Sequence, residues 1–227
     1  MRNASTFVVI PAYNEGKAIA KVIKDLKKGG YKNIIIIDDC STDNTAKVAE
    51  KEKVIVLKHA INRGQGAALK TGIDFALMNK ADIIITFDAD GQHRVEDIKN
   101  LIRPITNKKA DITLGSRFLG KAVNIPFLKK VVLKLGTIVV FFLYRIKVTD
   151  SQSGLRALSR KAAEAIDIRS DRMEHAGEIF HEIIRNNLKY VEVPITVIYD
   201  EYAIKKGQSW TKGFELGIKM IFRRLTK

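Results

Sequence analysis

The chain has 227 residues, 46% of them hydrophobic, and its 40 Lys and Arg against 25 Asp and Glu give a net charge of 40 − 25 = +15. This length suffices for one hydrophobic core and requires only one domain, and the single cysteine, Cys40, excludes an internal disulfide. The positive excess indicates a polyanionic partner, an anionic membrane surface, or a simple contribution to solubility.

The first 120 residues alternate continuous apolar runs with amphipathic helical patterns. The runs predict strands over 7–10, 34–37, 54–57, 83–85 and 112–114. We expect the first strand to stop at Pro11, and we expect Ser41 or Thr42 to cap the second helix. Uninterrupted apolar strands joined by helices predict an α/β fold with a mostly parallel sheet and helices on both faces.

The most informative motif follows the predicted strand 83–85. Asp88 and Asp90 are two residues apart, which on a strand would place both carboxylates on one face, and Gly91 then lets the chain turn away. Two carboxylates suit a Mg²⁺ or Mn²⁺ ion that keeps the rest of its shell for water and substrate phosphates. The motif therefore indicates a diphosphate substrate, and an ordinary polar turn after a strand is the alternative.

Two common nucleotide-binding loops are missing from the sequence. The first strand leads into Pro11-Ala12-Tyr13-Asn14-Glu15 instead of a glycine-rich turn, and Gly64-Gln65-Gly66 lacks the third glycine of the dinucleotide fingerprint. A phosphate-binding G-x-x-x-x-G-K-[ST] loop is also absent. These features disfavour a dinucleotide-binding domain and an ordinary nucleoside triphosphatase.

The second half is apolar and basic. The run 135–144, flanked by Lys and Arg, falls short of the roughly 18 residues that a membrane-spanning helix needs, so it is expected to lie on a membrane or in a core. A polar turn at 149–156, a helix over 179–188 and a strand over 191–199 follow. The tail 212–227 forms an amphipathic pattern with a basic edge, which suits a core-packed helix or a membrane-surface helix.

Five motifs occur in one order: Val9-Ile10-Pro11-Ala12-Tyr13-Asn14-Glu15, Asp38-Asp39-x-Ser41-x-Asp43, Asn62-x-Gly64-x-Gly66, Asp88-x-Asp90-x-Gln92-His93 and Gly115-Ser116-Arg117. Together they resemble the inverting family 2 glycosyltransferases of the GT-A fold. Within that family the chain is similar to the dolichyl-phosphate mannose synthase group and to relatives that load glucose onto polyprenyl phosphates. The resemblance implies a single GT-A domain over 1–227, with a nucleotide-sugar half (1–120) and an acceptor and membrane-surface half (121–227).

The resemblance also implies roles for individual residues. The base and ribose of the nucleotide would be held by Pro11, Tyr13, Glu15, Asp38 and Asp43. The metal ion would be held by Asp88, Asp90 and Gln92, which with Ala89 would also hold the sugar diphosphate. A Gly-x-Ser loop at 207–209 would cover the diphosphate, with Lys205 or Lys206 as its cation.

On the acceptor side, the resemblance and the residue chemistry point to three cations. Arg117 and Arg156 stand beside Ser or Gly at the ends of elements, where an arginine suits phosphate recognition, and Lys129 replaces an arginine that mannose synthases commonly carry. We predict that Arg117, Lys129 and Arg156 bind the acceptor phosphate, and that Asp90 and Arg117 are the catalytic residues. His93 is expected to have a supporting role.

The predicted activity is transfer of a hexose to a polyprenyl (dolichyl) phosphate with inversion, using Mg²⁺ or Mn²⁺. Mannose from GDP-mannose is the first expectation, and UDP-glucose or another UDP-sugar is the second. The protein would act peripherally at the cytoplasmic face of the cell membrane, where a membrane protein could be a further partner. A basic nucleic-acid-binding α/β protein is the alternative from another class, but the aromatic residues do not alternate with basic ones as base-stacking platforms require.

Overall fold

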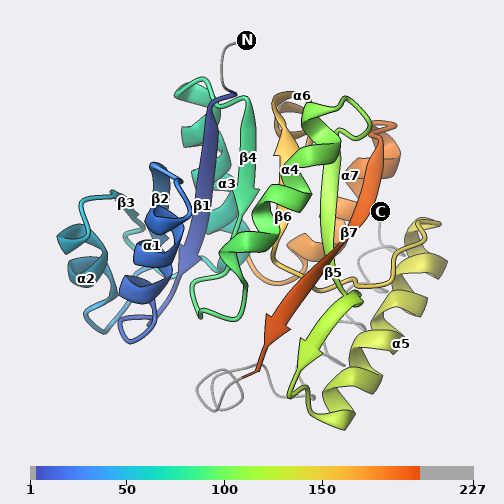
Figure 1. The fold of residues 1–227 in the computed structure, drawn as a ribbon, viewed down its shortest axis with the longest axis horizontal. Coiled ribbons are helices and arrows are strands. Elements are labelled where there is room, and N and C mark those ends of the chain that lie inside the picture. The colour runs from blue at the N-terminus through green and yellow to red at the C-terminus, as the bar shows by residue number, and fades with distance from the viewer. Residues whose placement is uncertain (1–3, 200–227) are drawn as a thin grey trace.

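The computed structural model describes residues 4–199, and these form a seven-stranded sheet in the order β3-β2-β1-β4-β6-β5-β7 (Figure 1). The elements in chain order are β1 (Thr6–Ala12), α1 (Ile19–Lys28), β2 (Asn33–Asp38), α2 (Thr45–Lys51), β3 (Ile55–Lys58), α3 (Gln65–Met78), β4 (Ile83–Thr86), η1 (Val95–Asp97), α4 (Ile98–Thr106), β5 (Ile112–Val123), α5 (Phe127–Tyr144), β6 (Arg156–Ser159), α6 (Arg160–Ala165), α7 (His175–Arg185) and β7 (Tyr190–Ile198). The predicted tail helix over 212–227, the loop 207–209 and Lys205 lie outside the described residues.

The strand directions decide where the functional residues gather. β1 pairs in parallel with β2 and β4, β2 pairs in parallel with β3, and β5 pairs in parallel with β7. Only β6 among the described strands is reversed, and it runs antiparallel to both β4 and β5. The mostly parallel sheet is therefore confirmed, and Arg156, the first residue of β6, pairs with Thr86, the last residue of β4.

Helices cover both faces of the sheet, as the sequence predicts (Figure 1). Along β1 the side chains alternate, with Val9 in the core that α3, α6 and α7 complete and Val8 in the core that α1 and α4 complete. The neighbouring β2 divides in the same way, between Ile35 and Ile36. This two-sided burial explains why the strands read as continuous apolar runs rather than alternating ones.

Two local predictions were wrong. β1 does not stop at Pro11 but continues to Ala12. The last pair between β1 and β4 is Val9 with Thr86, and Pro11 faces the β4 side beyond that pair. The N–H group that proline lacks is therefore not needed for a hydrogen bond between these strands. Neither Ser41 nor Thr42 caps α2. The carboxylate of Asp43 accepts the hydrogen bond from the Thr45 N–H at 2.9 Å instead, since it lies closer to the helix start.

The helix α5 lies along one edge of the molecule, beside the lower part of β5 (Figure 1). It buries Leu133 and Val140 and exposes an apolar stripe of Leu128, Val131, Leu135, Ile138 and Phe142, spaced three and four residues apart. Within residues 4–199, no helix has both the length and the apolar character needed to cross a membrane. The run 135–144 thus belongs partly to the core and partly to an exposed apolar face.

Candidate functional site

One cavity of about 670 Å³ opens where strand ends and helix starts converge. It is bounded by the carboxyl ends of β1 and β4, the start of β6, the middle of β5, and the N-terminal ends of α3 and α7. The predicted site residues that line it are Pro11, Tyr13, Glu15, Asp88, Ala89, Asp90, Gln92, Arg117, Lys129 and Arg156. The cavity therefore brings together residues from both halves of the chain. It lies outside the carboxyl ends of parallel strands, where ligands bind in open α/β sheets.

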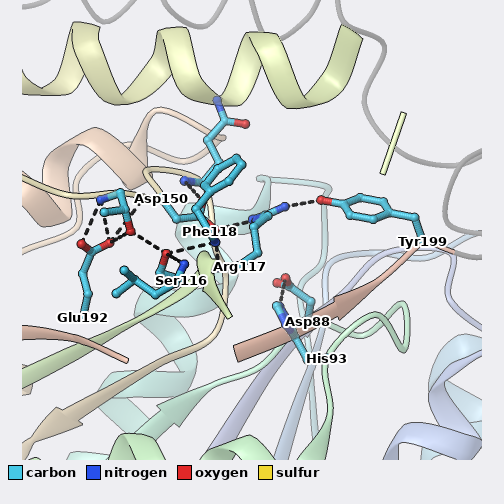
Figure 2. Close-up of polar contacts among 11 residues, drawn as sticks. Asp88, His93, Ser116, Arg117, Phe118, Asp150, Glu192 and Tyr199 are labelled. Carbon is cyan, nitrogen blue, oxygen red and sulfur yellow. Dashed lines mark hydrogen bonds and ion pairs between the residues drawn. The ribbon is translucent and has the colours of Figure 1, made fainter. Parts of the chain in front are cut away.

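Asp88 is held in place by hydrogen bonds from two side chains, His93 and Gln65. His93 Nε2 lies 2.8 Å from Asp88 Oδ2, and because a carboxylate only accepts, this nitrogen carries the proton (Figure 2). Gln65 Nε2 donates to Asp88 Oδ1 at 3.4 Å. Burial raises the pKa of Asp88, but the hydrogen bond and charge of His93, with Arg156 and Arg117, outweigh it and hold that pKa below its usual value.

Asp90 has the opposite electrostatic surroundings. Burial, and then the nearby charge of Asp88, raise the pKa of Asp90 to about 6, although its Oδ1 accepts a hydrogen bond from the Gln92 N–H at 3.0 Å. A raised carboxyl pKa beside a second carboxylate means that two negative charges meet in a poorly solvated place. A cation between them would remove that cost.

The donor set fits a divalent cation that is only partly coordinated by protein. Among residues 4–199, no group of three or more His, Cys, Asp or Glu side chains is placed to hold a metal ion. Asp88, Asp90 and the Gln92 amide all line the cavity, so the protein could supply two carboxylates and one neutral oxygen. Mg²⁺ is commonly bound in this way, with substrate phosphates and water filling its remaining positions.

Arg117 is anchored in a buried polar network (Figure 2). Its Nε donates to Asp150 Oδ2 at 2.6 Å and its Nη1 donates to the Tyr199 hydroxyl. Glu192 in turn holds the segment that carries Asp150, because its carboxylate accepts hydrogen bonds from the N–H groups of Thr149 and Asp150. Burial lowers the pKa of Arg117, but Asp150 and Tyr199 outweigh it and raise the pKa above its usual value.

The backbone of β5 is irregular at this point. Its pairing register with β7 shifts between Ser116 and Lys121, and Ser116 Oγ accepts from the N–H groups of Phe118 and Leu119 at 3.2 Å. Such irregularities bend a strand and redirect its side chains beside active sites. The Gly115-Ser116-Arg117 motif is therefore inside a strand, not after one.

Lys129 and Arg156 are two further cations that line the cavity. Burial and the charge of Arg117 lower the pKa of Lys129, while Asp90 partly opposes the shift. Burial also lowers the pKa of Arg156 to about 10, against the attraction of Asp88 and Asp150. Arg156 is only 3% exposed, and its Nη1 has no hydrogen-bond partner among the described residues. A buried, unpaired guanidinium nitrogen at the cavity wall favours an anionic ligand.

The remaining predicted nucleotide-binding residues are Asp38, Asp43 and Lys205. Asp38 and Asp43 are not among its described lining residues. Asp38 is buried, and its Oδ1 has no hydrogen-bond partner in the described part of the chain, while Asp43 accepts from Gly16 N–H at 3.0 Å. Lys205 is outside residues 4–199. The structure therefore leaves the nucleotide roles of these three residues untested.

Residues 172–176, to which the sequence assigned no site role, also line the cavity. The segment packs on α3, where a Cβ added to Gly66 would lie 3.0 Å from both the Arg172 carbonyl oxygen and His175 Cβ. His175 Nδ1 donates to the Arg172 carbonyl at 2.8 Å, which leaves Nε2 as the bare nitrogen. Burial and the charge of Arg156 lower the pKa of His175 to about 4, so the ring is neutral at neutral pH.

Asp39, Asp150 and Tyr199 were also missed as contributors. Asp39 accepts from the backbone N–H groups of Arg63 and Gly64 and thereby orients the loop that starts α3. Asp39 belongs to a motif that the sequence displays, so a signal for it existed. Asp150 and Tyr199 lie 33 and 82 residues from Arg117, and no local pattern links them to it.

Comparisons with known proteins agree with this geometry. A family model described as "Glycosyl transferase family 2" matches residues 7–167. The chain is 38% identical to the UDP-N-acetylglucosamine–dolichyl-phosphate N-acetylglucosaminyltransferase of Methanococcus voltae, over 100% of this chain and 99% of that protein. It is 29% identical to the polyprenol monophosphomannose synthase of Mycolicibacterium smegmatis, over 88% of this chain and 80% of that protein.

The fold is also similar to a solved structure. Glucosyl-3-phosphoglycerate synthase from Mycobacterium tuberculosis, crystallised in complex with Mn²⁺ and UDP-glucose, superposes with a TM-score of 0.75. The similarity covers 98% of this chain and 79% of that chain at 17% sequence identity. At this identity the likeness establishes the fold, and the predicted GT-A architecture is confirmed.

Proposed function

Because the chain belongs to the family 2 glycosyltransferases, we propose that it transfers a sugar from a nucleotide diphosphate donor to a polyprenyl phosphate, with inversion at the anomeric carbon. Both relatives described above carry names of sugar transferases that act on lipid-linked phosphates or polyprenols. Their similarity extends over most of each chain, which supports the same acceptor class here.

The observation that carries this proposal is that two carboxylates and three cations line the same cavity. The carboxylates are Asp88 and Asp90, and the cations are Arg117, Lys129 and Arg156. The carboxylates suit a diphosphate that arrives with a divalent cation, and the cations suit a second phosphate. An acceptor that carries its own phosphate uses both groups of side chains. An alcohol would not supply a partner for the buried Arg156 Nη1, which has none among residues 4–199.

The reaction is a single displacement in which no proton needs to be removed. A phosphate monoester has a second pKa near roughly 6, so its oxygen is already an anion at neutral pH. That oxygen bonds to the anomeric carbon while the bond from this carbon to the diphosphate breaks, and the electron pair leaves with the nucleoside diphosphate. Arg117, Lys129 and Arg156 orient the attacking phosphate by charge-assisted hydrogen bonds.

Asp88, Asp90 and Gln92 would hold the divalent cation, which supplies charge neutralisation for the departing diphosphate. Hydrogen bonds from His93 and Gln65 fix the orientation of the Asp88 carboxylate. At the other end of the donor, Pro11, Tyr13 and Glu15 line the cavity where a base and ribose would lie. Asp38 Oδ1 has no hydrogen-bond partner among residues 4–199, which supports an additional contact from a base N–H group.

We propose a UDP-sugar, UDP-N-acetylglucosamine before UDP-glucose, as the donor to test first. The relative with the greater identity and the fuller coverage is named for UDP-N-acetylglucosamine. GDP-mannose, the first expectation from the sequence, is supported by the name of a less similar relative and stays the second candidate.

The proposal is tested by a matrix of donors and acceptors with the full chain and Mn²⁺ or Mg²⁺. UDP-N-acetylglucosamine, UDP-glucose and GDP-mannose are each paired with a short polyprenyl phosphate and with the corresponding polyprenol, and lipid-linked product is measured. We expect transfer from one donor to the phosphate and at least a roughly hundredfold lower rate with the polyprenol. Equal rates with phosphate and alcohol would show that the acceptor assignment is wrong.

A further inference from the structure

Tyr199 contacts both Arg117 and Lys129 without being among the described residues that line the cavity. Its hydroxyl accepts a hydrogen bond from Arg117 Nη1 (Figure 2), and the centroid of its ring lies 4.7 Å from Lys129 Nζ. The side chain is 1% exposed. Tyr199 can therefore act on a ligand in the cavity through these two cations, without lining the cavity itself.

The position of Tyr199 is fixed by the sheet. It directly follows β7, and its backbone N–H donates to the Val123 carbonyl, at the end of β5, at 3.0 Å. The same β5 carries Arg117, and α5, which carries Lys129, begins four residues after Val123. One aromatic side chain thus stands at the junction of the elements that supply the two cations.

We propose that Tyr199 is a positioning residue that holds Arg117 and Lys129 at the spacing needed to grip one acceptor phosphate. This inference rests on the proposed function, because it assigns the two cations to the acceptor. It adds a residue that neither touches the substrate nor belongs to any of the sequence motifs.

Such a residue is needed because the positive charges of Arg117 and Lys129 repel each other. After burial, the charge of Arg117 is the next cause that lowers the pKa of Lys129, so the two cations oppose each other in a poorly solvated place. The face of an aromatic ring attracts an ammonium group, and a phenolic oxygen accepts from a guanidinium. Tyr199 offers both surfaces at once, while Asp150 neutralises Arg117 from the side of its Nε.

The test separates the hydroxyl from the ring. Tyr199→Phe keeps the ring and Tyr199→Leu removes both features, and each full-length variant is assayed for kcat and for the KM of the lipid phosphate and of the nucleotide sugar. We expect Tyr199→Phe to raise the acceptor KM roughly tenfold, the usual effect of losing a hydrogen bond to a charged group. Tyr199→Leu should raise it roughly fivefold further. The donor KM and kcat should stay within about twofold, since the phosphate is held equally before and during reaction.

Two controls make the result specific. Tyr190→Phe, at the first residue of β7, removes a hydroxyl that donates to the Lys147 carbonyl at 3.3 Å, and it should leave the acceptor KM unchanged. In an Arg117→Ala background, Tyr199→Phe should have no further effect, because the hydroxyl acts through Arg117. This comparison stays valid if a variant loses stability, since both backgrounds share that loss.

The outcomes distinguish the inference from its premise. If the wild type glycosylates the lipid phosphate but Tyr199→Phe leaves the acceptor KM unchanged, or changes donor and acceptor KM equally, the positioning role is wrong and the function stands. An undiminished effect of Tyr199→Phe in the Arg117→Ala background also refutes it. If the wild type transfers sugar to no polyprenyl phosphate, the proposed function fails first and the inference fails with it.

Discussion

Asp88 and Asp90 leave the same strand end, yet their protonation differs because their neighbours differ. Cations around Asp88 hold its carboxyl pKa low, whereas burial and Asp88 itself raise that of Asp90 to about 6. In the cation-free protein Asp90 is therefore largely protonated at pH 5 and largely ionised at pH 7. Cation binding must displace that proton, so cation affinity should fall as the pH is lowered from 7 to 5.

We predict that Asp90→Asn lowers kcat at least roughly hundredfold, since it removes charge stabilisation worth several kcal/mol. The same variant should bind Mn²⁺ weakly, and its affinity should no longer change between pH 7 and pH 5. Mn²⁺ titration followed by electron paramagnetic resonance measures both effects. Asp74→Asn, which alters an exposed pair with Lys70, is the matched control. Unchanged Mn²⁺ binding in Asp90→Asn would refute the cation assignment.

His175 gives the protein a predictable sensitivity to acid. Burial, then Arg156, lower its pKa to about 4 in the folded state, against about 6.5 in the unfolded chain. Between these values the unfolded chain binds the extra proton, so stability falls as the pH falls, by up to about 3 kcal/mol. We predict that His175→Gln abolishes this contribution, so that urea unfolding curves of variant and wild type converge between pH 7.5 and 4.5. A constant difference in unfolding free energy would contradict it.

At the scale of elements, the junction of β4 and β6 brings a glycine against the Asp88 carboxylate. A Cβ added to Gly154 would lie 2.2 Å from Asp88 Oδ1 and 2.3 Å from Oδ2. The two residues meet because β6 runs antiparallel to β4 and begins where β4 ends. Gly154 therefore determines whether Asp88 can keep its hydrogen bond with His93.

We predict that Gly154→Ala displaces the Asp88 carboxylate and lowers kcat and Mn²⁺ affinity each by at least roughly tenfold. The melting temperature should change little, because the displaced atoms belong to a side chain at the cavity. Gly136→Ala is the matched control, since its Cβ would lie 3.1 Å from Ser151 Oγ and 3.7 Å from Gln152 Nε2, and alanine favours the helix. Equal activity of both variants would show that the close approach has no catalytic role.

The elements also show how far the sequence alone could lead. Long apolar strands and amphipathic helices, and the motifs at carboxyl ends, were predictable because their signals are local. β6 was not predicted, since its four residues, Arg156-Ala157-Leu158-Ser159, are too few to show the alternating pattern of a strand. It is a strand because it pairs with β4, which is distant in the sequence. The supports of Arg117 were hidden for a related reason: Asp150 and Tyr199 reach it only through tertiary packing.

At the scale of the whole molecule, the net charge of +15 and the exposed apolar face of α5 both suit binding to an anionic membrane. The exposed apolar stripe of α5 is accompanied by exposed Lys130 and Lys134, and Lys129 of the same helix lines the cavity. Basic residues near an anionic bilayer contribute about 1 kcal/mol each, and apolar side chains add burial in the interface. We propose that α5 lies in the membrane interface, so that the acceptor's phosphate is presented to Lys129 from the lipid side.

We predict that the full chain binds vesicles containing anionic lipid at low salt and is released as salt rises, because screening removes the charge contribution. Leu135→Glu should weaken binding at least roughly tenfold, since it replaces a half-exposed apolar contact by a charge that anionic lipid repels. Met78→Glu makes the same change at a more exposed position on α3 and should leave binding unaffected. If Met78→Glu weakens binding as much as Leu135→Glu, only net charge matters and α5 has no special role. If wild type binds duplex RNA as tightly as vesicles, and with the same salt dependence, the positive charge serves nucleic acid and the membrane assignment is wrong.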